Sequence, residues 1–335
     1  MLEHRPGEQL DPMISPRFAQ IATFARLPHY RSLDDISPLG LFLGIPFDGG
    51  TTFYSGARLA PTCIRLESRL LRPYNKALDV YPFRILRAID YGDIDIIPTN
   101  IERTLEAIEV SVREISSRNI VPFIAGGDHS ITLGVLRGIS RYKPILIHMD
   151  SHLDYWPAYW GGERYTHGTW VRRAIEEGLV SRVIQIGIRG PQFNKEDLEY
   201  PRESTVPIDI IFMDDIVSNG IEWLVEKMLG LEGKVYISLD IDVVDPAYAP
   251  GTGTREVGGF TSREIIEVVR ALSKSNIDLV GFDVVEVCPL LDHSKITCLL
   301  AANLIYEAMS VKAYHIIKNE YSMRVERIAS RVEKI

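Results

Sequence analysis

The sequence predicts an α/β fold with a central, mostly parallel sheet that is covered by helices on both faces. Short apolar runs typical of buried strands alternate with amphipathic segments along most of the 335 residues. In the clearest amphipathic segment, apolar residues recur at spacings of four and three from Ile101 to Ile115, which is one stripe of a helix. No repeat, low-complexity tract or Gly/Ser linker divides the chain. We therefore expect one such domain rather than two.

The elements follow in order along the chain. Residues 1–38 are polar and contain prolines, so we expect an irregular N-terminal arm there and a single domain over residues 39–335. Open α/β sheets bind ligands beyond the carboxyl ends of their strands, so the residues after each strand are the candidates for a site. We expect strands at Leu41–Ile45, Ile85–Ile89, Val121–Ala125, Ile145–Met149, Val183–Ile188, Asp209–Met213, Val235–Leu239 and Leu279–Phe282.

Composition narrows the class of protein. Apolar residues make up 46% of the chain and charged residues 24%, which excludes a disordered chain, a collagen-like fibre or a small disulfide scaffold. The net charge of −8 gives no reason to expect nucleic acid as a partner and mildly favours cationic ligands. Three scattered cysteines are too few for a disulfide framework, which favours a reducing compartment. With no signal-peptide pattern and no long apolar run, we expect a cytoplasmic protein without a membrane span.

Three potential metal ligands follow the predicted strand Ile145–Met149, at Asp150, His152 and Asp154. Their spacing of two residues puts them on the same side of an extended backbone. Taken alone, this pattern is as typical of a polar strand end as of a metal site.

Two further strand ends carry the same residue types. Asp240 and Asp242 follow Val235–Leu239, where aspartates are also common as turn residues. His129 follows another strand in the segment GGDHS, where a lone histidine is more often structural. Together, however, the three strand ends supply two histidines and four aspartates, whose charge of −4 matches two divalent ions. We therefore expect a binuclear metal site formed by His129, Asp150, His152, Asp154, Asp240 and Asp242.

These ligand types predict the chemistry of the site. Oxygen-rich ligation with some imidazole favours Mn²⁺, although imidazole also suits Ni²⁺ or Zn²⁺. Two ions about 3.5–4 Å apart can share a water molecule and hold it as hydroxide near neutral pH. Without the ions, four close carboxylates would repel one another and take up protons. The pattern therefore predicts metal-assisted hydrolysis.

Longer segments around these residues resemble the ureohydrolases, the arginase and agmatinase family. The likeness runs in order from about residue 16 to residue 315 and is similar to the agmatinase and guanidinobutyrase branch in particular. It implies a three-layer α/β/α arginase-like fold with a central sheet of eight strands. The segments are GIPFDGGTTFYSGARLAPTCIR at 44–65, GGDHS at 126–130, DSHLD at 150–154, YTHGTWVRRAIEEGL at 165–179, SLDIDVVDPAYAPGTGT at 238–254 and GFDVVEVCP at 281–289.

The resemblance also implies the reaction and the role of each site residue. Hydrolysis of a guanidino C–N bond would release urea and an amine, as in the amidinohydrolases of class EC 3.5.3. His167 would carry protons and Glu286 would bind the substrate guanidinium, and with Asp154 they form the expected catalytic group. One ion would be held by His129, Asp150, Asp154 and Asp240, and the other by Asp150, His152, Asp240 and Asp242.

Departures from the family pattern bear on the substrate tail. Trp156, Tyr159 and Trp160 either pack a loop or subunit contact, or form an aromatic wall that binds a cationic or N-alkylated group. Arg164 is the one cation in this stretch, which weakens the case for a long guanidino acid. Ser151 replaces the usual alanine and is expected to point away from the ions. Asp128 is expected to orient the ring of His129.

Several substrates and assemblies stay open. The branch resemblance favours agmatine or 4-guanidinobutyrate, whereas the aromatic stretch leaves room for a compact substrate: guanidine, a methylated guanidine, or a biguanide such as metformin. The chain could also be a non-catalytic subunit paired with a related active chain, although such subunits normally lose ligands. The resemblance suggests a homo-oligomer, a trimer or hexamer. No nucleic-acid or membrane partner is expected.

Overall fold

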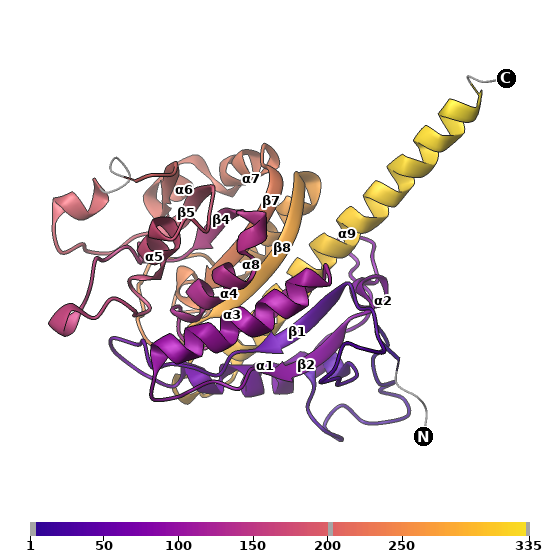
Figure 1. Cartoon of the computed structure of the whole chain (residues 1–335), viewed down its shortest axis with the longest axis horizontal. Coiled ribbons are helices and arrows are strands. Elements are labelled where there is room, and N and C mark those ends of the chain that lie inside the picture. The colour runs from indigo at the N-terminus through magenta and orange to yellow at the C-terminus, as the bar shows by residue number, and fades with distance from the viewer. Residues whose placement is uncertain (1–4, 200–203, 333–335) are drawn as a thin grey trace.

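In the residues that the structure describes, eight strands form one sheet and every neighbouring pair is parallel (Figure 1). The computed structural model describes residues 5–199 and 204–332, and side chains up to residue 321. The order across the sheet is β2-β1-β3-β8-β7-β4-β5-β6. The strands are β1 Gly40–Gly44, β2 Ile89–Asp93, β3 Val121–Ala125, β4 Ile145–Met149, β5 Arg182–Ile188, β6 Ile208–Phe212, β7 Glu232–Asp240 and β8 Asn276–Val285.

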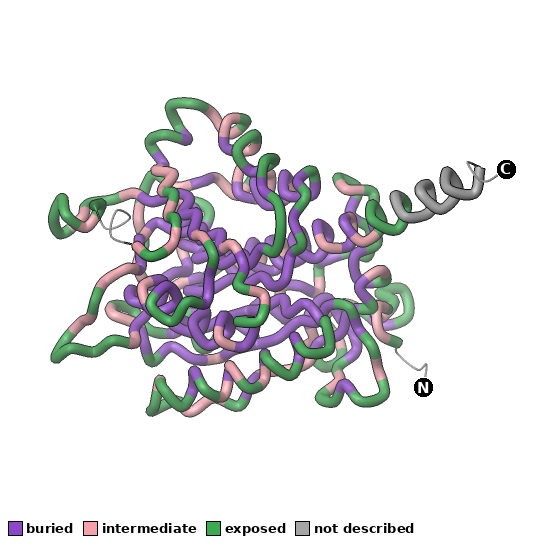
Figure 2. Tube along the Cα trace, turned by 45° about the horizontal axis from the view of Figure 1, so that its top comes forward, coloured by how far each residue is buried: buried purple, intermediate pink, exposed green. Residues whose placement is uncertain are grey.

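Helices cover both faces of this sheet, so the predicted three-layer arrangement is confirmed (Figures 1 and 2). Successive residues of a strand point to opposite faces, and each face has its own apolar core. One core contains residues of α1 Ala60–Glu67, α2 Pro82–Leu86, α6 Met213–Asn219, α7 Ile221–Leu229, α8 Ser262–Ala271 and α9 Ile296–Val332. The other contains residues of α3 Ile101–Ser117, α4 Ile131–Gly138 and α5 Trp170–Glu176.

Seven of the eight predicted strands coincide with strands of the sheet or overlap them over most of the predicted length, but the prediction at Ile85–Ile89 is wrong, because it shares only Ile89 with β2. Helix α2 occupies the first part of that run because Pro82 starts a helix readily at its first position. The chain then turns at Arg87, whose φ is +48°, and β2 begins only at Ile89. Since β2 lies at the edge of the sheet and is partly exposed, it needs no continuous apolar run.

The N-terminal arm packs against the sheet. Within the described residues it contains one short 3₁₀ helix, Phe24–Arg26, and Phe24 stacks on Phe42 of β1 with ring centroids 4.4 Å apart. The predicted boundary at residue 38 falls just before β1. Residues 1–4 of the predicted arm, and 200–203 and 333–335 of the predicted domain, lie outside the described residues.

Helix α9 contains a long apolar segment. Its segment Ile296–Tyr321 is long and apolar enough to cross a membrane by length and composition alone, although no such span was expected. However, 78% of its most apolar window is buried inside the fold, where it packs on α1, α2 and α8. Packing in the core therefore accounts for this hydropathy. The C-terminal part of the helix projects from the body of the molecule (Figure 1).

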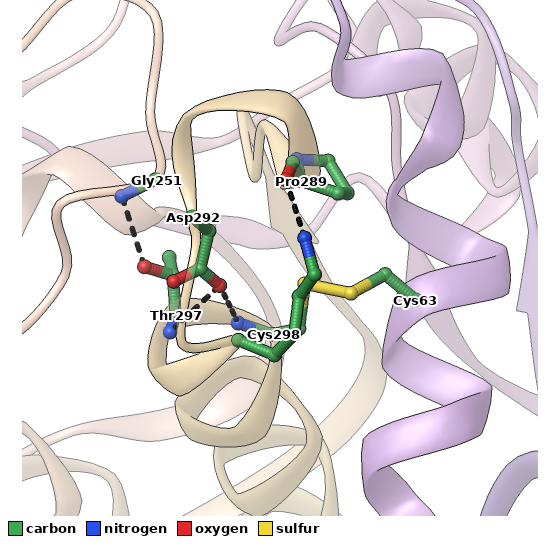
Figure 3. The surroundings of a disulfide bond; sticks show 7 residues. Cys63, Gly251, Pro289, Asp292, Thr297 and Cys298 are labelled. Atoms are coloured by element: carbon green, nitrogen blue, oxygen red, sulfur yellow. Dashed lines mark hydrogen bonds between the residues drawn. A yellow bond between two sulfur atoms is a disulfide. The ribbon is translucent and has the colours of Figure 1, made fainter.

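A disulfide joins Cys63 of α1 to Cys298 of α9 (Figure 3). The two residues are 235 positions apart, which is why the sequence did not indicate the pair. Asp292 caps the start of α9 beside this bond, because its Oδ2 accepts hydrogen bonds from the backbone N–H groups of Thr297 and Cys298. The third cysteine, Cys288, is free and buried.

Candidate active site

The predicted site residues follow four neighbouring strands. Strands β3, β8, β7 and β4 lie side by side and run in the same direction, so the segments after them meet at one edge of the sheet. This edge holds His129 after β3, Glu286 after β8, Asp242 after β7 and Asp150 after β4. All four are fully buried or nearly so.

One cluster surrounds Nδ1 of His129. This nitrogen lies 3.0 Å from Asp150 Oδ2, 3.1 Å from Asp154 Oδ2 and 3.3 Å from Asp240 Oδ2. It is buried and makes no hydrogen bond with any described residue. Ligands about 2.1 Å from one ion lie about 3.0 to 3.4 Å apart, depending on the angle at the ion. These four side chains therefore fit a divalent metal ion.

A second cluster adjoins the first. His152 Nδ1 lies 3.1 Å from Asp242 Oδ2 and 3.4 Å from Asp150 Oδ1. Asp150 therefore directs one oxygen at each cluster, as a bridging ligand would. Asp240 directs Oδ2 at the first cluster, and its Oδ1 accepts a hydrogen bond of 2.8 Å from the backbone N–H of Asp242. The two clusters together have the donor set of a binuclear divalent metal site.

The ring of His129 is held by residues that the sequence reasoning missed. Ser238 Oγ donates to Asp283 Oδ1 at 2.7 Å, so it accepts a hydrogen bond from His129 Nε2–H at 2.8 Å. That bond leaves the lone pair of Nδ1 directed at the three carboxylates. Asp128 does not take this role as expected. It accepts instead from the backbone N–H groups of Gly50 and Ser130.

His148 also lies within the first cluster and was not predicted. Its Nδ1 accepts a hydrogen bond of 3.0 Å from Gln185 Nε2, so its Nε2–H donates to Asp150 Oδ2 at 2.8 Å. Both ring nitrogens are thus engaged, and His148 orients Asp150 rather than binding an ion itself. A signal was present in the sequence, because His148 precedes Asp150 by two residues on the same strand face.

The residues after β4 converge for a different reason than the one predicted. The strand ends at Met149, and Asp154 has φ +51°, so an extended backbone does not align the three side chains. Asp154 is fixed instead by Trp170, whose indole Nε1–H donates to its Oδ2 at 2.8 Å. Because the strand has ended, Ser151 also faces the cluster, contrary to expectation, and its hydroxyl donates to Asp242 Oδ1 at 2.7 Å.

The electrostatics of the cluster are those of a cation site. Burial, with the nearby charges of Asp242 and Asp150, raises the pKa of Asp240 well above its usual value. Burial and the charge of Asp150 also raise the pKa of Asp242. Burial lowers the pKa of His129, but its three carboxylate neighbours outweigh this and raise that pKa well above the usual value. In the absence of ions, these raised pKa values favour the protonated forms of Asp240, Asp242 and His129.

His167 and Glu286 form a pair beside the clusters. Glu286 Oε1 lies 2.9 Å from His167 Nδ1 and accepts from the backbone N–H of His129 at 2.8 Å. On the other side of the ring, Nε2 accepts from the backbone N–H of Thr52 at 3.1 Å. Burial lowers the pKa of His167, but the charge and hydrogen bond of Glu286 raise it to about 9. A backbone amide only donates, so a protonated Nε2 would donate instead to the hydroxyl Oγ1 of Thr52, which lies 2.6 Å away.

A cavity of about 260 Å³ lies over the two clusters. His152, Asp154, Asp240 and His167 line it, whereas Glu286 lies behind His167 and is not in the wall. Trp156 and Tyr159 line the cavity. Trp160 does not: its side chain is 67% exposed and packs on Tyr159 with ring centroids 5.5 Å apart. Arg164 pairs with Glu176 at 3.0 Å, away from the cavity wall.

The fold and the site define a class of protein: a parallel α/β protein with a His/Asp cluster for divalent metals at the carboxyl ends of its strands. Residues 40–311 match the arginase family, and the chain belongs to that family. It is 40% identical over 312 residues to a guanidinopropionase of Pseudomonas aeruginosa, which covers 91% of this chain and 96% of that protein. It is 41% identical over 305 residues to a guanidinobutyrase of the same organism, covering 88% and 93%.

A solved structure supports the same assignment. The proclavaminate amidinohydrolase of Streptomyces clavuligerus superposes with a TM-score of 0.81 at 36% sequence identity, covering 90% of this chain and 99% of that chain. The expected arginase-like fold is therefore confirmed.

Proposed function

We propose that the protein hydrolyses the C–N bond of a guanidino compound and releases urea and an amine. The observation that carries this proposal is the buried Nδ1 of His129, which faces three carboxylates without a hydrogen bond and adjoins a second His/Asp cluster. Membership of the arginase family and the names of the relatives support the same reaction. The substrate class is agmatine-like or guanidinobutyrate-like.

The proposed metal ligands are the six predicted side chains. When bound, two divalent ions, with Mn²⁺ favoured and Ni²⁺ as the alternative, supply an ionised water as the nucleophile near neutral pH. Asp150 would be a ligand to both ions, because its Oδ2 lies beside His129 and its Oδ1 beside His152. The ligands are His129, Asp150, His152, Asp154, Asp240 and Asp242.

His167 and Glu286 act on the substrate rather than on the ions in this proposal. His167 Nε2 faces the cavity beside Thr52 and is the atom that takes up and releases a proton for the leaving amine. Glu286 holds that ring through Nδ1. Its Oε1 is taken by His167 and by the backbone of His129, so Oε2 is the oxygen that would bind the substrate guanidinium.

A compact substrate and a non-catalytic role both have less support. The relatives named above carry substrate names with a guanidino group on an acid tail, which does not favour a compact guanidine as the substrate. A non-catalytic subunit is not favoured either, because all six ligands and the His167–Glu286 pair are present. A cytoplasmic location and a homo-oligomer, trimer or hexamer, or a hetero-oligomer with a related chain, are proposals from composition and family resemblance alone.

The test is urea release from a panel of guanidines by protein reconstituted separately with Mn²⁺ and Ni²⁺. We expect urea from at least one guanidino compound with an alkyl tail. Metal content is measured on the same samples, so that a failure to load is told apart from a failure to react. Fully loaded protein that releases no urea from any member of the panel would contradict the proposal.

A further inference from the structure

We propose that Glu256 selects substrates by the charge of their tail, favouring an amine-ended tail and rejecting a carboxylate-ended one. The inference rests on the proposed function, because it concerns the part of the guanidino compound that does not react. The names of its guanidinopropionase and guanidinobutyrase relatives imply substrates with an acid tail. The proposal therefore gives this chain a different substrate preference from those relatives.

The wall of the cavity carries negative charge without a matching cation. Among the described residues, its carboxylates are Asp154, Asp240 and Glu256, and no lysine or arginine lines it. Asp154 and Asp240 face His129 in the metal cluster, so their charge is matched by the ions. Glu256 is half-buried, and its carboxylate makes no hydrogen bond or ion pair within the described part of the chain. Its charge is therefore available to a ligand.

Arg189, which is close enough to affect Glu256 electrostatically, is engaged elsewhere. Its guanidinium has five N–H groups, and five backbone carbonyls accept from it at 2.6 to 3.3 Å. Two of these carbonyls belong to Glu256 and Val257, so Arg189 fixes the loop that carries Glu256 without pairing with its carboxylate. The guanidinium therefore has no donor left for a carboxylate on a substrate.

The backbone opposite Glu256 leaves room for its carboxylate. Gly190 has φ +75°, and a side chain there would begin 2.7 Å from the carboxylate carbon of Glu256. Glycine is favoured at this position because few other residues adopt this backbone conformation. The close approach sets the carboxylate over the 190–193 segment, whose residues Pro191, Gln192 and Phe193 line the same cavity.

A pocket beside the cavity has the same sign of charge. A neighbouring pocket of about 380 Å³ shares Leu153 and Trp156 with the active cavity. Its cation, Arg172, is paired with Glu176 at 2.9 Å. Its acidic residues are Glu196, Asp197 and Glu199. Cationic molecules are attracted along such a surface and anionic ones are repelled.

The aromatic residues fit the same ligand. Trp156 and Tyr159 line the cavity on the segment before His167, and their faces attract a cation while offering nothing to a carboxylate. An ammonium group at the end of an alkyl tail would therefore meet an unpaired carboxylate and aromatic rings. A carboxylate at the same place would meet like charge.

The experiment compares three tails on one scaffold: agmatine with an amine end, butylguanidine with an uncharged end, and 4-guanidinobutyrate with an acid end. We expect kcat/KM to fall in that order, by about twofold to fivefold at each step, which is typical of a partly exposed charge pair. Glu256→Gln should bring the amine-ended and acid-ended substrates closer together, and Glu256→Lys should reverse their order. Higher salt should reduce the difference in the wild-type protein.

Binding of the matched amines, which cannot be hydrolysed, gives a second readout. Calorimetric dissociation constants of 1,4-diaminobutane, butylamine and 4-aminobutyrate should follow the same order and respond to Glu256→Gln in the same way. Glu226→Gln is the matched control, because Glu226 is exposed on α7 away from the cavity and its replacement changes the net charge equally.

The outcomes separate the two proposals. If no guanidine yields urea while the amines still bind in the expected order, the proposed function fails and the role of Glu256 stands. If urea is released but the acid-ended compounds bind and react best, the role of Glu256 is overturned. The same holds if Glu256→Gln changes the order no more than Glu226→Gln does.

Discussion

Two regions of the cavity differ in how firmly their residues are held: the floor, formed by the His/Asp clusters, and the mouth, formed by the aromatic segment and Glu256. On the floor, His129 and Asp150 are fully buried, and His129 is anchored through Ser238 to Asp283 while His148 anchors Asp150. At the mouth, aromatic residues and Glu256 lie on loops, and Trp160 is mostly exposed. The difference indicates that the reaction is fixed by buried strand ends, whereas substrate choice depends on residues that can change without disturbing the core.

The largest effect is expected when a metal-binding residue on the floor of the cavity is replaced. Asp240→Ala or His152→Ala should release one ion and lower turnover by about a thousandfold or more, because the nucleophile depends on both ions. Metal analysis and urea release measure the two effects. Asp214→Ala, an exposed aspartate on α6, is the control. Two ions still bound in both ligand variants would contradict the assignment.

Glu286→Gln should separate substrate binding from metal binding. The change removes the charge that holds His167 and that we propose for the guanidinium, so kcat/KM should fall by about a hundredfold. Metal content should stay at two ions per chain, because Glu286 contacts the backbone of His129 and not its ring. Loss of an ion in this variant would show that its role is misassigned.

Ser238→Ala tests whether the anchoring of His129 matters. Without the hydroxyl, the ring loses its hydrogen-bond acceptor and Asp283 loses a donor, so metal affinity should fall by about 10-fold to 100-fold. Competition with a metal-binding dye measures the affinity. Ser218→Ala, exposed on α6, should have no effect. Unchanged metal affinity in Ser238→Ala would mean that His129 is held adequately by packing alone.

The folding stability of the protein should depend on pH with opposite signs in the metal-free and the metal-loaded state. In metal-free protein, the pKa values of His129 and His167 are raised, that of His167 to about 9, so above pH 6.5 the folded state keeps protons that the unfolded chain releases. Stability should therefore fall as the pH rises from about 6.5 to 9, by about 1.4 kcal/mol per pH unit for each such proton. With Mn²⁺ bound, stability should fall as the pH drops, since protons displace the metal.

Denaturant unfolding of chelated and Mn²⁺-loaded samples between pH 6 and pH 9 measures both slopes. Slopes of the same sign would contradict the description of the cluster as a cation site.

The smallest effect is expected at the mouth. Trp160→Ala should change KM by less than about twofold, because the side chain lies outside the cavity wall. Trp156→Ala should change KM by several-fold for amine-ended substrates, because the ring lines the cavity. Equal effects of the two substitutions on KM would remove the distinction between them.

Much of the fold was predictable because apolar runs mark strands that are buried on both faces. The prediction at Ile85–Ile89 was wrong where this rule does not apply, since β2 is an edge strand with partly exposed residues. The spacing of Asp150, His152 and Asp154 pointed to side chains that do lie together. The extended backbone that the spacing assumed is absent, however, because Asp154 lies beyond the strand in a left-handed conformation.

The sequence by itself determined the kinds of group at the site, because residues directly after parallel strands meet at one sheet edge whatever the packing of their neighbours. The tertiary structure decided which partner holds each group. Ser238 reaches His129 across 109 positions, Cys298 reaches Cys63 across 235, and the donors of Arg189 are used by carbonyls from other loops. Such contacts depend on side-chain positions in the folded chain, so local sequence patterns do not predict them.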